Sequence, residues 1–441
     1  MSTIISYNIN SIAILIKEIK KIVATRRMTF RLYPNKQIEQ SLRYHRKLHK
    51  DLFNAAVYNR FTQYKKFKHC VSYLEQQNSL PAFKEVWTEY KEINSQALQA
   101  TLKRVDFAFE RWFKGLGKRP KFKSIRHYSG WAYPAKTGYS VDSNGENGYI
   151  TLSKIGRIQM RGKAKYWGNP TTCTIVYRNG KWYASITVDV LDQVLKPEVL
   201  PIGAIGIDLG CKSALSITDG EIHQQVEAPK FLRNAEHKIK QASKEKRRKQ
   251  ARNRKKKVKA SRRWKKAQNK VSKLTRKVAN QRQNWAHQVA TEIVSGNSFV
   301  ATEKLEVRNM TSIAKKGKRK KQKSGLNKSI LDVGFGMLHT TIKYKVEQIG
   351  GVFVEVPTKK VKPSQTCPKC GHQHKKTLDV RVHKCSVCGY VQDRDIAAAE
   401  VMLYWAKGNL PGFGTNLEDA DVTSSTSRAS KKAGSMKQLG R

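Results

Sequence analysis

Apolar residues recur at spacings of three and four in two long segments near the start of the chain. The first segment spans residues 36–66, and its apolar side is formed by Ile38, Leu42, Leu48, Leu52, Ala55 and Ala56. The second spans residues 93–113, with one face formed by Leu98, Leu102, Val105, Phe109 and Trp112. This period predicts two amphipathic helices. We interpret their apolar and aromatic side chains as core packing.

Between residues 131 and 190 apolar and polar residues alternate instead. Alternation predicts short strands, the clearest of which are 149–152, 174–177 and 182–188. Asn179-Gly180 separates the last two strands, and this dipeptide favours a two-residue hairpin turn. Another alternating stretch, 29–33, precedes the first helix. Together these strands suit a small β-barrel, and residues 191–201 have the character of a linker.

From residue 202 onward strands and helices alternate in a third pattern. Strands are expected at 203–208, 213–217, 221–226, 297–303 and 351–356. An apolar helical repeat lies between residues 271 and 293, a basic loop is expected at 315–328, and further helices are expected at 329–349 and 395–405. An order with three strands before the first helix is that of an RNase H-like α/β fold.

Charge changes this picture, because the 441-residue chain has a net charge of +54 spread over most of its length. A field of that sign attracts polyphosphate, so nucleic acid is the expected partner. A protein that only coats nucleic acid, of ribosomal or chromatin type, is the alternative. We expect no membrane partner, since no stretch approaches the roughly 20 apolar residues of a membrane span.

The densest basic run lies between Lys238 and Arg282, where 22 of 45 positions are Lys or Arg and Glu245 is the one acid. Solvated helical faces usually mix both signs, so this run indicates contacts with a nucleic-acid backbone. Such contacts confer affinity with little sequence information. Trp264 and Trp285 either stack on bases or pack, and packing is favoured for Trp285, which lies on the apolar stripe.

Four of the seven cysteines form two Cys-x-x-Cys-Gly knuckles, with fourteen residues between Cys370 and Cys385. This spacing predicts a closed, structural zinc site formed by Cys367, Cys370, Cys385 and Cys388. An iron–sulfur cluster is the rival, although the glycine after each knuckle suits a zinc ribbon. We interpret the nearby His372, His374 and His383 as solvated or as phosphate contacts, with replacement of a cysteine ligand as the alternative.

The remaining cysteines, Cys70, Cys173 and Cys211, are scattered, which favours a reducing compartment. The expected location is therefore the cytoplasm, in association with the nucleoid. An apolar patch at residues 12–16 is too short for a signal peptide and is followed by its charges. Residues 1–27 are predicted to be a disordered extension, with Met28 as an alternative start. Residues 408–441 are predicted to be a disordered tail.

Three acids share one setting, because Asp208 and Glu303 end predicted strands and Asp395 begins the last helix. Carboxylates suit magnesium, and pairs of such ions about 4 Å apart support phosphodiester cleavage. Each acid alone is weak evidence, and Asp393 is a rival to Asp395. Asp393 is also a favoured type of residue for capping the helix.

These features together resemble the TnpB (OrfB) family of transposon-encoded RNA-guided DNA endonucleases, which are related to type V CRISPR effectors. The resemblance extends from about Met28 to Lys407. The matching segments are 28–34, 107–122, Gly206-Ile-Asp208-Leu-Gly210, Glu303-Lys-Leu-Glu306, Pro363 to Gly371, Cys385 to Gly389 and Asp393 to Ala399.

The resemblance implies a multidomain protein of mixed α+β and α/β class. Its expected parts are a wedge β-barrel (28–35 and 121–192), a helical recognition domain (36–120) and an RNase H-like (RuvC) nuclease domain (202–407). The nuclease domain would contain a basic helical segment (232–295) and an inserted zinc ribbon (363–392).

The resemblance further implies a RuvC site in which Asp208, Glu303 and Asp395 hold Mg²⁺, or Mn²⁺ in its place. The implied partners are a guide RNA from the transposon end and double-stranded target DNA beside a short adjacent motif, and a monomer is favoured. One departure is Ala397, where the family usually has Asn. The alternative function is therefore a guide-RNA-dependent DNA-binding protein or repressor with a weak or inactive nuclease site.

Overall fold

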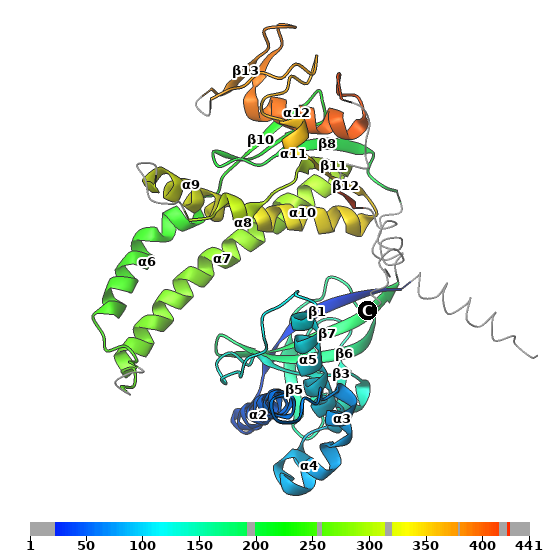
Figure 1. Cartoon of the computed structure of the whole chain (residues 1–441), viewed down its shortest axis with the longest axis vertical. Coiled ribbons are helices and arrows are strands. Elements are labelled where there is room, and N and C mark those ends of the chain that lie inside the picture. Colours follow the sequence, from blue (N-terminus) through cyan, green and yellow to red (C-terminus); the bar gives the residue numbers. More distant parts are fainter. Residues whose placement is uncertain are drawn as a thin grey trace, which may run out of the picture. The chain divides into compact units, whose positions relative to one another are not determined.

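Residues up to Leu195 form one unit of the chain, and residues from Lys196 form a second. The computed structural model describes residues 23–191, 199–253, 258–313, 320–377, 380–413 and 421–423. Each unit has its own sheet and its own hydrophobic core (Figure 1).

The first unit contains a seven-stranded antiparallel sheet of order β2-β6-β7-β1-β5-β4-β3. Its strands are β1 (Val23–Tyr33), β2 (Gly130–Tyr133), β3 (Tyr139–Asp142), β4 (Gly148–Leu152), β5 (Gly156–Arg161), β6 (Asn169–Arg178) and β7 (Lys181–Leu191). Asn179 and Gly180 link β6 to β7 with φ values of 59° and 79°. Positive φ at both positions is the geometry of the predicted tight hairpin, which is confirmed.

Strand β1 begins earlier than the alternating pattern suggested. It pairs with β7 from Val23, opposite Leu191, to Leu32, opposite Trp182. The prediction of a disordered extension is therefore wrong for residues 23–27, because β7 supplies their backbone hydrogen bonds. Residues 1–22 lie outside the described part of the chain.

Helices of the first unit are α2 (Lys36–Phe67), α3 (Tyr73–Asn78), α4 (Leu80–Val86) and α5 (Ser95–Phe113), with short 3-10 turns at Thr88–Glu92 and Lys136–Gly138. Asn35 and Asn94 cap α2 and α5, since each side chain accepts a hydrogen bond from the backbone N–H three residues later. Most of the apolar side chains predicted for the two helices lie in the core, including Leu42, Leu98 and Val105, whereas Ala55 is exposed.

The second unit contains a six-stranded sheet of order β10-β9-β8-β11-β12-β15. Its strands are β8 (Gly203–Asp208), β9 (Ser213–Thr218), β10 (His223–Glu227), β11 (Asn297–Glu303), β12 (Val352–Val356) and β15 (Asp421–Thr423). Strand β8 is antiparallel to β9 but parallel to β11, and β11 is parallel to β12. The three consecutive strands β8–β9–β10 precede the first helix, as predicted.

Helices cover both faces of this sheet. The helices of the second unit are α6 (Phe231–Arg247), α7 (Arg262–Gly296), α8 (Val307–Met310), α9 (Lys320–Val333), α10 (Phe335–Ile349), α11 (Thr358–Val361) and α12 (Arg394–Lys407), and α7, α10 and α12 supply the side chains that pack on the sheet. Alternation along β11 explains the layers: Val300 belongs to the core with α7 and α10, whereas Ala301 belongs to the core with α12. At Gly206 on β8, an added Cβ would lie 2.0 Å from the Ala399 carbonyl oxygen. Glycine therefore allows α12 to lie directly against β8.

Three expectations for this unit are corrected. The basic loop predicted at 315–328 is helical from Lys320 onward, and the helix predicted at 329–349 is broken into α9 and α10. Gly334 separates the two helices with φ of 80°, a left-handed conformation that an uninterrupted helix cannot contain. In the predicted disordered tail, residues 421–423 form β15, which pairs with the edge of β12.

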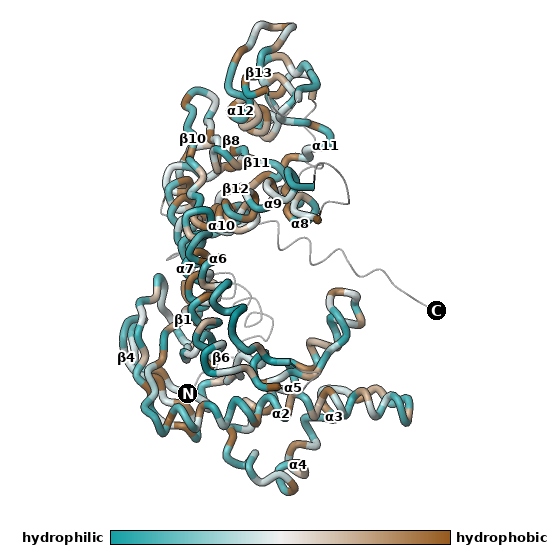
Figure 2. Tube along the Cα trace, turned by 90° about the vertical axis from the view of Figure 1, so that its left-hand side faces the viewer, coloured by the Kyte–Doolittle hydropathy of each residue, from teal (hydrophilic) through white to brown (hydrophobic). Residues whose placement is uncertain are grey.

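Between β10 and β11 the chain forms an antiparallel arm made of α6 and α7. Hydrophilic positions predominate along it (Figure 2). Asp332 on α9 anchors the base of the arm. Its buried carboxylate accepts hydrogen bonds from the Leu232 backbone N–H (2.8 Å), from the Arg233 N–H and from Arg282 on α7.

Candidate active site and zinc site

Two of the predicted acids lie at the same edge of the second sheet. Asp208 is the last residue of β8 and Glu303 is the last residue of β11. The strands are parallel, and Thr302 lies opposite Ile207, so the two acids follow in register on neighbouring strands. The carboxyl ends of parallel strands form the usual position of ligand sites in α/β sheets.

Helix α12 brings the third acid to this edge. Asp395 is the second residue of α12, and its Oδ2 would lie 3.9 Å from a Cβ added at Gly210, just after β8. Asp393 is the N-cap and accepts hydrogen bonds from the backbone N–H groups of Asp395 (2.9 Å) and Ile396 (3.2 Å). The capping role considered for Asp393 is therefore confirmed, and Asp395 is the acid near β8.

Asp208 interacts electrostatically with Glu303 and with Asp395, so the three acids lie near one another. Burial raises the pKa of Asp208 well above its ordinary value, and repulsion from Glu303 and Asp395 raises it further. Burial also raises the pKa of Glu303 to about 7. Clustered carboxylates resist ionisation unless a cation compensates their charge, so the site favours binding of a positive ion.

The donor set fits hard divalent cations, because it consists of carboxylate oxygens with no sulfur or imidazole among them. Among the described residues, the group of potential ligands whose atoms all lie within 4.8 Å of one another is the set of four cysteines.

Two arginines beside the acids were missed at the level of sequence. Arg394 Nε lies 3.4 Å from Asp395 Oδ1, and Arg381 Nη1 lies 3.8 Å from Asp395 Oδ2. Arg381 comes from the segment between the two cysteine knuckles and is largely exposed. Its separation from Asp395 along the chain follows no motif, so only the folded chain reveals the contact.

Replacing Asp208 by Asn should stabilise the protein when no magnesium is present. The ionised carboxylate destabilises the fold above its unfolded pKa, because the folded state holds this proton more tightly. Removing that charge should raise the melting temperature at pH 7 by roughly 2–4 °C, which corresponds to about 1 kcal/mol.

This comparison requires metal-depleted buffer without chelator, so that the cysteine site keeps its metal. The advantage of Asp208→Asn should shrink as the pH falls toward the ordinary aspartate pKa of about 3.9, because the wild-type carboxyl becomes protonated. An Asp208→Asn protein that melts below wild type at pH 7 would contradict the repulsion described above.

The four predicted zinc ligands converge into one cluster. Cys367 Sγ lies 3.6 Å from Cys388 Sγ, and Cys370 Sγ lies 3.6 Å from Cys385 Sγ. Tetrahedral zinc with Zn–S bonds of about 2.3 Å requires sulfurs about 3.8 Å apart. All four cysteines are free of disulfides, so the cluster fits a closed zinc site.

The two knuckles have the same backbone geometry. Gly371 and Gly389 each donate a hydrogen bond to the carbonyl of the first cysteine in their knuckle, at 2.9 and 3.1 Å. Both glycines have positive φ, 74° and 72°. Although burial opposes ionisation, N–H groups of Cys388 and Val387 help to lower the pKa of Cys385 to about 6. Burial raises the pKa of Cys367 to about 12, so the surroundings favour the thiolate at Cys385 but not at Cys367.

The expectation of a solvated histidine is wrong for His383, which is buried beside the knuckles. Its Nδ1 contacts Lys376, and burial followed by the Lys376 charge lowers its pKa to about 4. His372 and His374 are both exposed. None of the three belongs to the ligand cluster found in the described residues.

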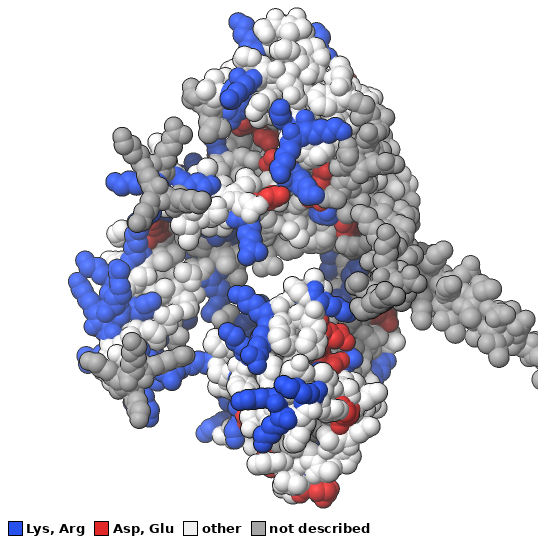
Figure 3. Space-filling model, in the orientation of Figure 1, with Lys and Arg blue, Asp and Glu red and all other residues white. Residues whose placement is uncertain are grey.

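Lys and Arg side chains gather over the arm formed by α6 and α7 (Figure 3). One face of α7 is hollowed by about 400 Å³ and is lined by Lys273, Arg276, Lys277, Asn280, Gln281 and Asn284. The opposite side of α7 packs on the core, where Trp285 is partly buried. Packing of Trp285 is therefore confirmed, and the outer face is free for an anionic partner.

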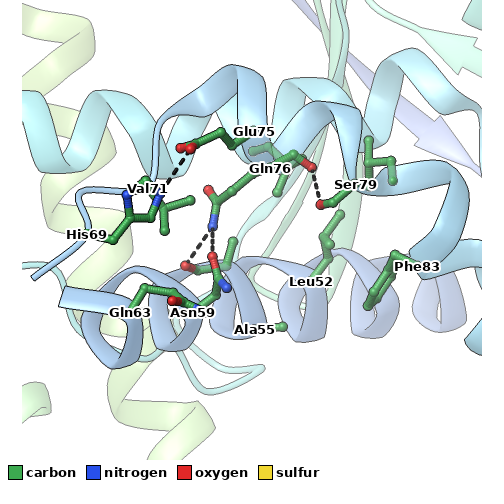
Figure 4. A pocket seen from close by; sticks show the side chains of 13 residues that line it. Leu52, Ala55, Asn59, Gln63, His69, Val71, Glu75, Gln76, Ser79 and Phe83 are labelled. Atoms are coloured by element: carbon green, nitrogen blue, oxygen red, sulfur yellow. Dashed lines mark hydrogen bonds and ion pairs between the residues drawn. The ribbon is translucent and has the colours of Figure 1, made fainter. Parts of the chain in front are cut away.

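A second hollow of about 410 Å³ lies in the first unit between α2, α3 and α4 (Figure 4). Its floor is apolar, with Leu52 and Phe83 among the lining residues. The polar side chain of Gln76 already has hydrogen-bond partners within the protein. Its amide donates to the Ala56 carbonyl and to Asn59 Oδ1 and accepts from Arg60. The pocket contains no cluster of catalytic groups comparable to the carboxylate site.

Two family models match parts of the chain that begin at residue 185. A model described as "Probable transposase" (OrfB_IS605) matches residues 185–314, and one described as "Cas12f1-like, TNB domain" matches residues 335–402. The first match spans β8 with Asp208 and β11 with Glu303. The second spans the cysteine cluster and Asp395.

Curated relatives match a larger share of the chain. It is 28% identical over 319 residues to "Putative RNA-guided DNA endonuclease InsQ" of Escherichia coli (strain K12), covering 71% of this chain and 75% of that protein. It is 27% identical over 359 residues to "Putative RNA-guided DNA endonuclease" of Streptomyces pristinaespiralis, covering 80% of this chain and 82% of that protein.

Among solved structures, the fold is similar to the protein in "Cryo-EM structure of the Cas12f1-sgRNA-target DNA complex". The TM-score is 0.58 with 14% identity, and the match covers 86% of this chain and 98% of that chain. Within the described residues, the helices are too short or too polar to span a membrane.

Proposed function

We propose that this chain, which is a TnpB-like protein, is an RNA-guided and magnesium-dependent DNA endonuclease of an insertion sequence. The observation that carries this proposal is the clustering of Asp208, Glu303 and Asp395, whose mutual repulsion raises the pKa of Asp208. Buried carboxylates in that arrangement destabilise the fold unless a cation binds them.

In this proposal Asp208, Glu303 and Asp395 hold magnesium, with manganese as a substitute. The ions would activate water and stabilise the leaving oxygen of a phosphodiester. The protein's own part is positional: β8 and β11 fix two carboxylates at one sheet edge, and the Asp393 cap fixes the start of α12. Arg381 and Arg394 add positive charge beside Asp395, where a phosphate would arrive.

The partners follow from charge and from the names of the relatives. A net charge of +54 and the basic face of α7 suit binding to nucleic-acid backbones. We propose a guide RNA from the transposon end and double-stranded target DNA with a short adjacent motif as these partners. Zinc would fill the cysteine cluster, and the protein would act as a monomer in the cytoplasm, where the nucleoid lies.

The proposed division of labour follows the two units. Residues 28–35 and 121–192 would act as a wedge barrel, and residues 36–120 as a recognition domain. Residues 202–407 would be the nuclease domain, with the basic segment 232–295 and the zinc ribbon 363–392. The first two domains would hold the guide and the adjacent motif, and the third would cut.

The decisive experiment starts from the RNA that co-purifies with the full-length protein. Sequencing that RNA should identify a guide, and the complex should then cleave matching duplex DNA in magnesium. RNase treatment or a mismatched target is expected to abolish cleavage. Guided binding without cutting in magnesium or manganese would favour the repressor, and binding to unrelated RNA of every sequence would favour a coating protein.

A further inference from the structure

Glu400 lies at the centre of a buried contact that joins three parts of the second unit. It belongs to α12, the helix that presents Asp395, and only 4% of its surface is exposed. Its two carboxylate oxygens face different neighbours. Oε2 accepts a hydrogen bond from the Tyr390 hydroxyl, and Oε1 lies 3.6 Å from His223 Nε2.

Tyr390 connects this contact to the cysteine cluster. It follows Gly389 in the second knuckle, and its backbone carbonyl accepts a hydrogen bond of 2.9 Å from the Cys385 N–H. One residue thus holds a knuckle through its backbone and α12 through its side chain. The second knuckle cannot shift without moving the partner of Glu400.

His223 connects the same contact to the sheet. Its Nδ1 lies 2.9 Å from the Thr218 hydroxyl, which also accepts a hydrogen bond from the Gly220 N–H. Thr218 pairs with Gly206 on β8, two residues before Asp208. Gly206 is also the point of closest approach between β8 and Ala399, the neighbour of Glu400 on α12.

We propose that Glu400 is a positioning residue, which locks α12 to the zinc knuckle and to the β9–β10 hairpin and so sets Asp395 against Asp208. Glu400 lies five positions after Asp395, a distance of about 7.5 Å along a helix. Asp395 and Glu400 belong to the same helix, so a small rotation of α12 about the contact at Glu400 would displace the Asp395 carboxylate. The inference rests on the proposed function, since Glu400 would position acids that are proposed to bind metal.

The chemistry of the contact explains why a carboxylate is needed. The Tyr390 hydroxyl donates a hydrogen bond to one oxygen of Glu400, and the other oxygen faces His223 Nε2 at the distance of an ion pair. Without Glu400, the hydroxyl of the half-buried Tyr390 would lose its acceptor. A glutamine keeps one acceptor oxygen for Tyr390, whereas an alanine keeps neither.

The test compares Glu400→Ala, Glu400→Gln and Tyr390→Phe with wild type in the full-length protein. Isothermal titration of Mn²⁺ into protein freed of RNA by high salt gives a readout independent of cleavage. Outer-shell partners of metal ligands contribute roughly 10- to 100-fold to metal affinity. Glu400→Ala and Tyr390→Phe should weaken Mn²⁺ binding by about tenfold, and Glu400→Gln should remain close to wild type.

Zinc content and melting temperature are measured on the same samples. The matched control is Tyr344→Phe, because the Tyr344 hydroxyl also contacts a histidine, His287 at 3.0 Å, between α10 and α7. The control should bind Mn²⁺ as wild type does. All variants should retain zinc, since the four cysteines are unchanged.

The outcomes distinguish a failure of the proposed function from a failure of the positioning role of Glu400. If wild type neither binds Mn²⁺ nor cleaves guided DNA, the proposed function fails. If wild type binds Mn²⁺ and Glu400→Ala binds it equally well, only the positioning role fails. Equal losses in Glu400→Ala, Glu400→Gln and Tyr344→Phe would indicate general packing and would likewise overturn that role.

Discussion

Asp208→Ala should abolish guided DNA cleavage while leaving guided DNA binding intact. Asp208 ends the strand at the middle of the sheet, and both other acids raise its pKa. Removing it deletes the carboxylate most strongly coupled to the rest of the site. Loss of one member of a catalytic unit typically lowers the rate by about 10⁴-fold or more.

The measurement is single-turnover cleavage of a matched duplex by the complex with its co-purified RNA, in saturating magnesium. Binding of the same duplex is followed separately in calcium, an ion with flexible coordination that suits binding without efficient cleavage. Glu221→Ala provides the control, because it removes an exposed carboxylate from the turn between β9 and β10 of the same sheet. Equal cleavage by wild type and Asp208→Ala would disprove the assignment of Asp208.

Replacing Cys367 and Cys370 together by Ser should have the second large effect, on structure as well as activity. These two sulfurs are half of the cluster, and their knuckle places Gly371 against Pro411, whose carbonyl oxygen would lie 2.0 Å from a Cβ added at the glycine. Structural zinc contributes on the order of 10 kcal/mol of folding free energy in small zinc domains. Without it the segment before α12 should unfold, and Asp395 should lose its fixed place.

Elemental analysis should find zinc in wild type and none in the double variant. Cleavage should fall as far as in Asp208→Ala, and protease should cut the chain between β12 and α12. Cys70→Ser is the matched control, since Cys70 is exposed and lies in the first unit. Unchanged zinc content in the double variant would refute this role for the cysteines.

Both predictions concern residues that the sequence could identify, because each residue belongs to a local pattern along the chain. The knuckles are local, because the two cysteines of each pair are close along the chain and the glycine that follows must adopt positive φ. Asp208 and Glu303 each follow a run of apolar strand residues, and parallel strands bring their ends to one edge. The Asn179-Gly180 hairpin was likewise predictable, because turn geometry restricts the residues that can form it.

Other features depended on partners distant in sequence. Residues 23–27 form a strand because β7 lies beside them, and residues 421–423 form one because they pair with β12. The break at Gly334 lies within an otherwise continuous apolar period, which gave no sign of it. His383 looked like a loop histidine, yet the fold buries it against Lys376.

The amino-acid sequence by itself therefore determined the candidate groups for chemistry, namely three acids, four thiols and a large basic excess. Local spacing and strand pattern encode these groups, so no knowledge of distant contacts was needed. Only the tertiary structure decided the pKa values of these groups and the neighbouring side chains that hold them in place. The raised pKa of Asp208, the arginines beside Asp395 and the contact of Glu400 with Tyr390 and His223 all arise from side chains that long-range packing brings together, and electrostatic and hydrogen-bond energies depend on those distances.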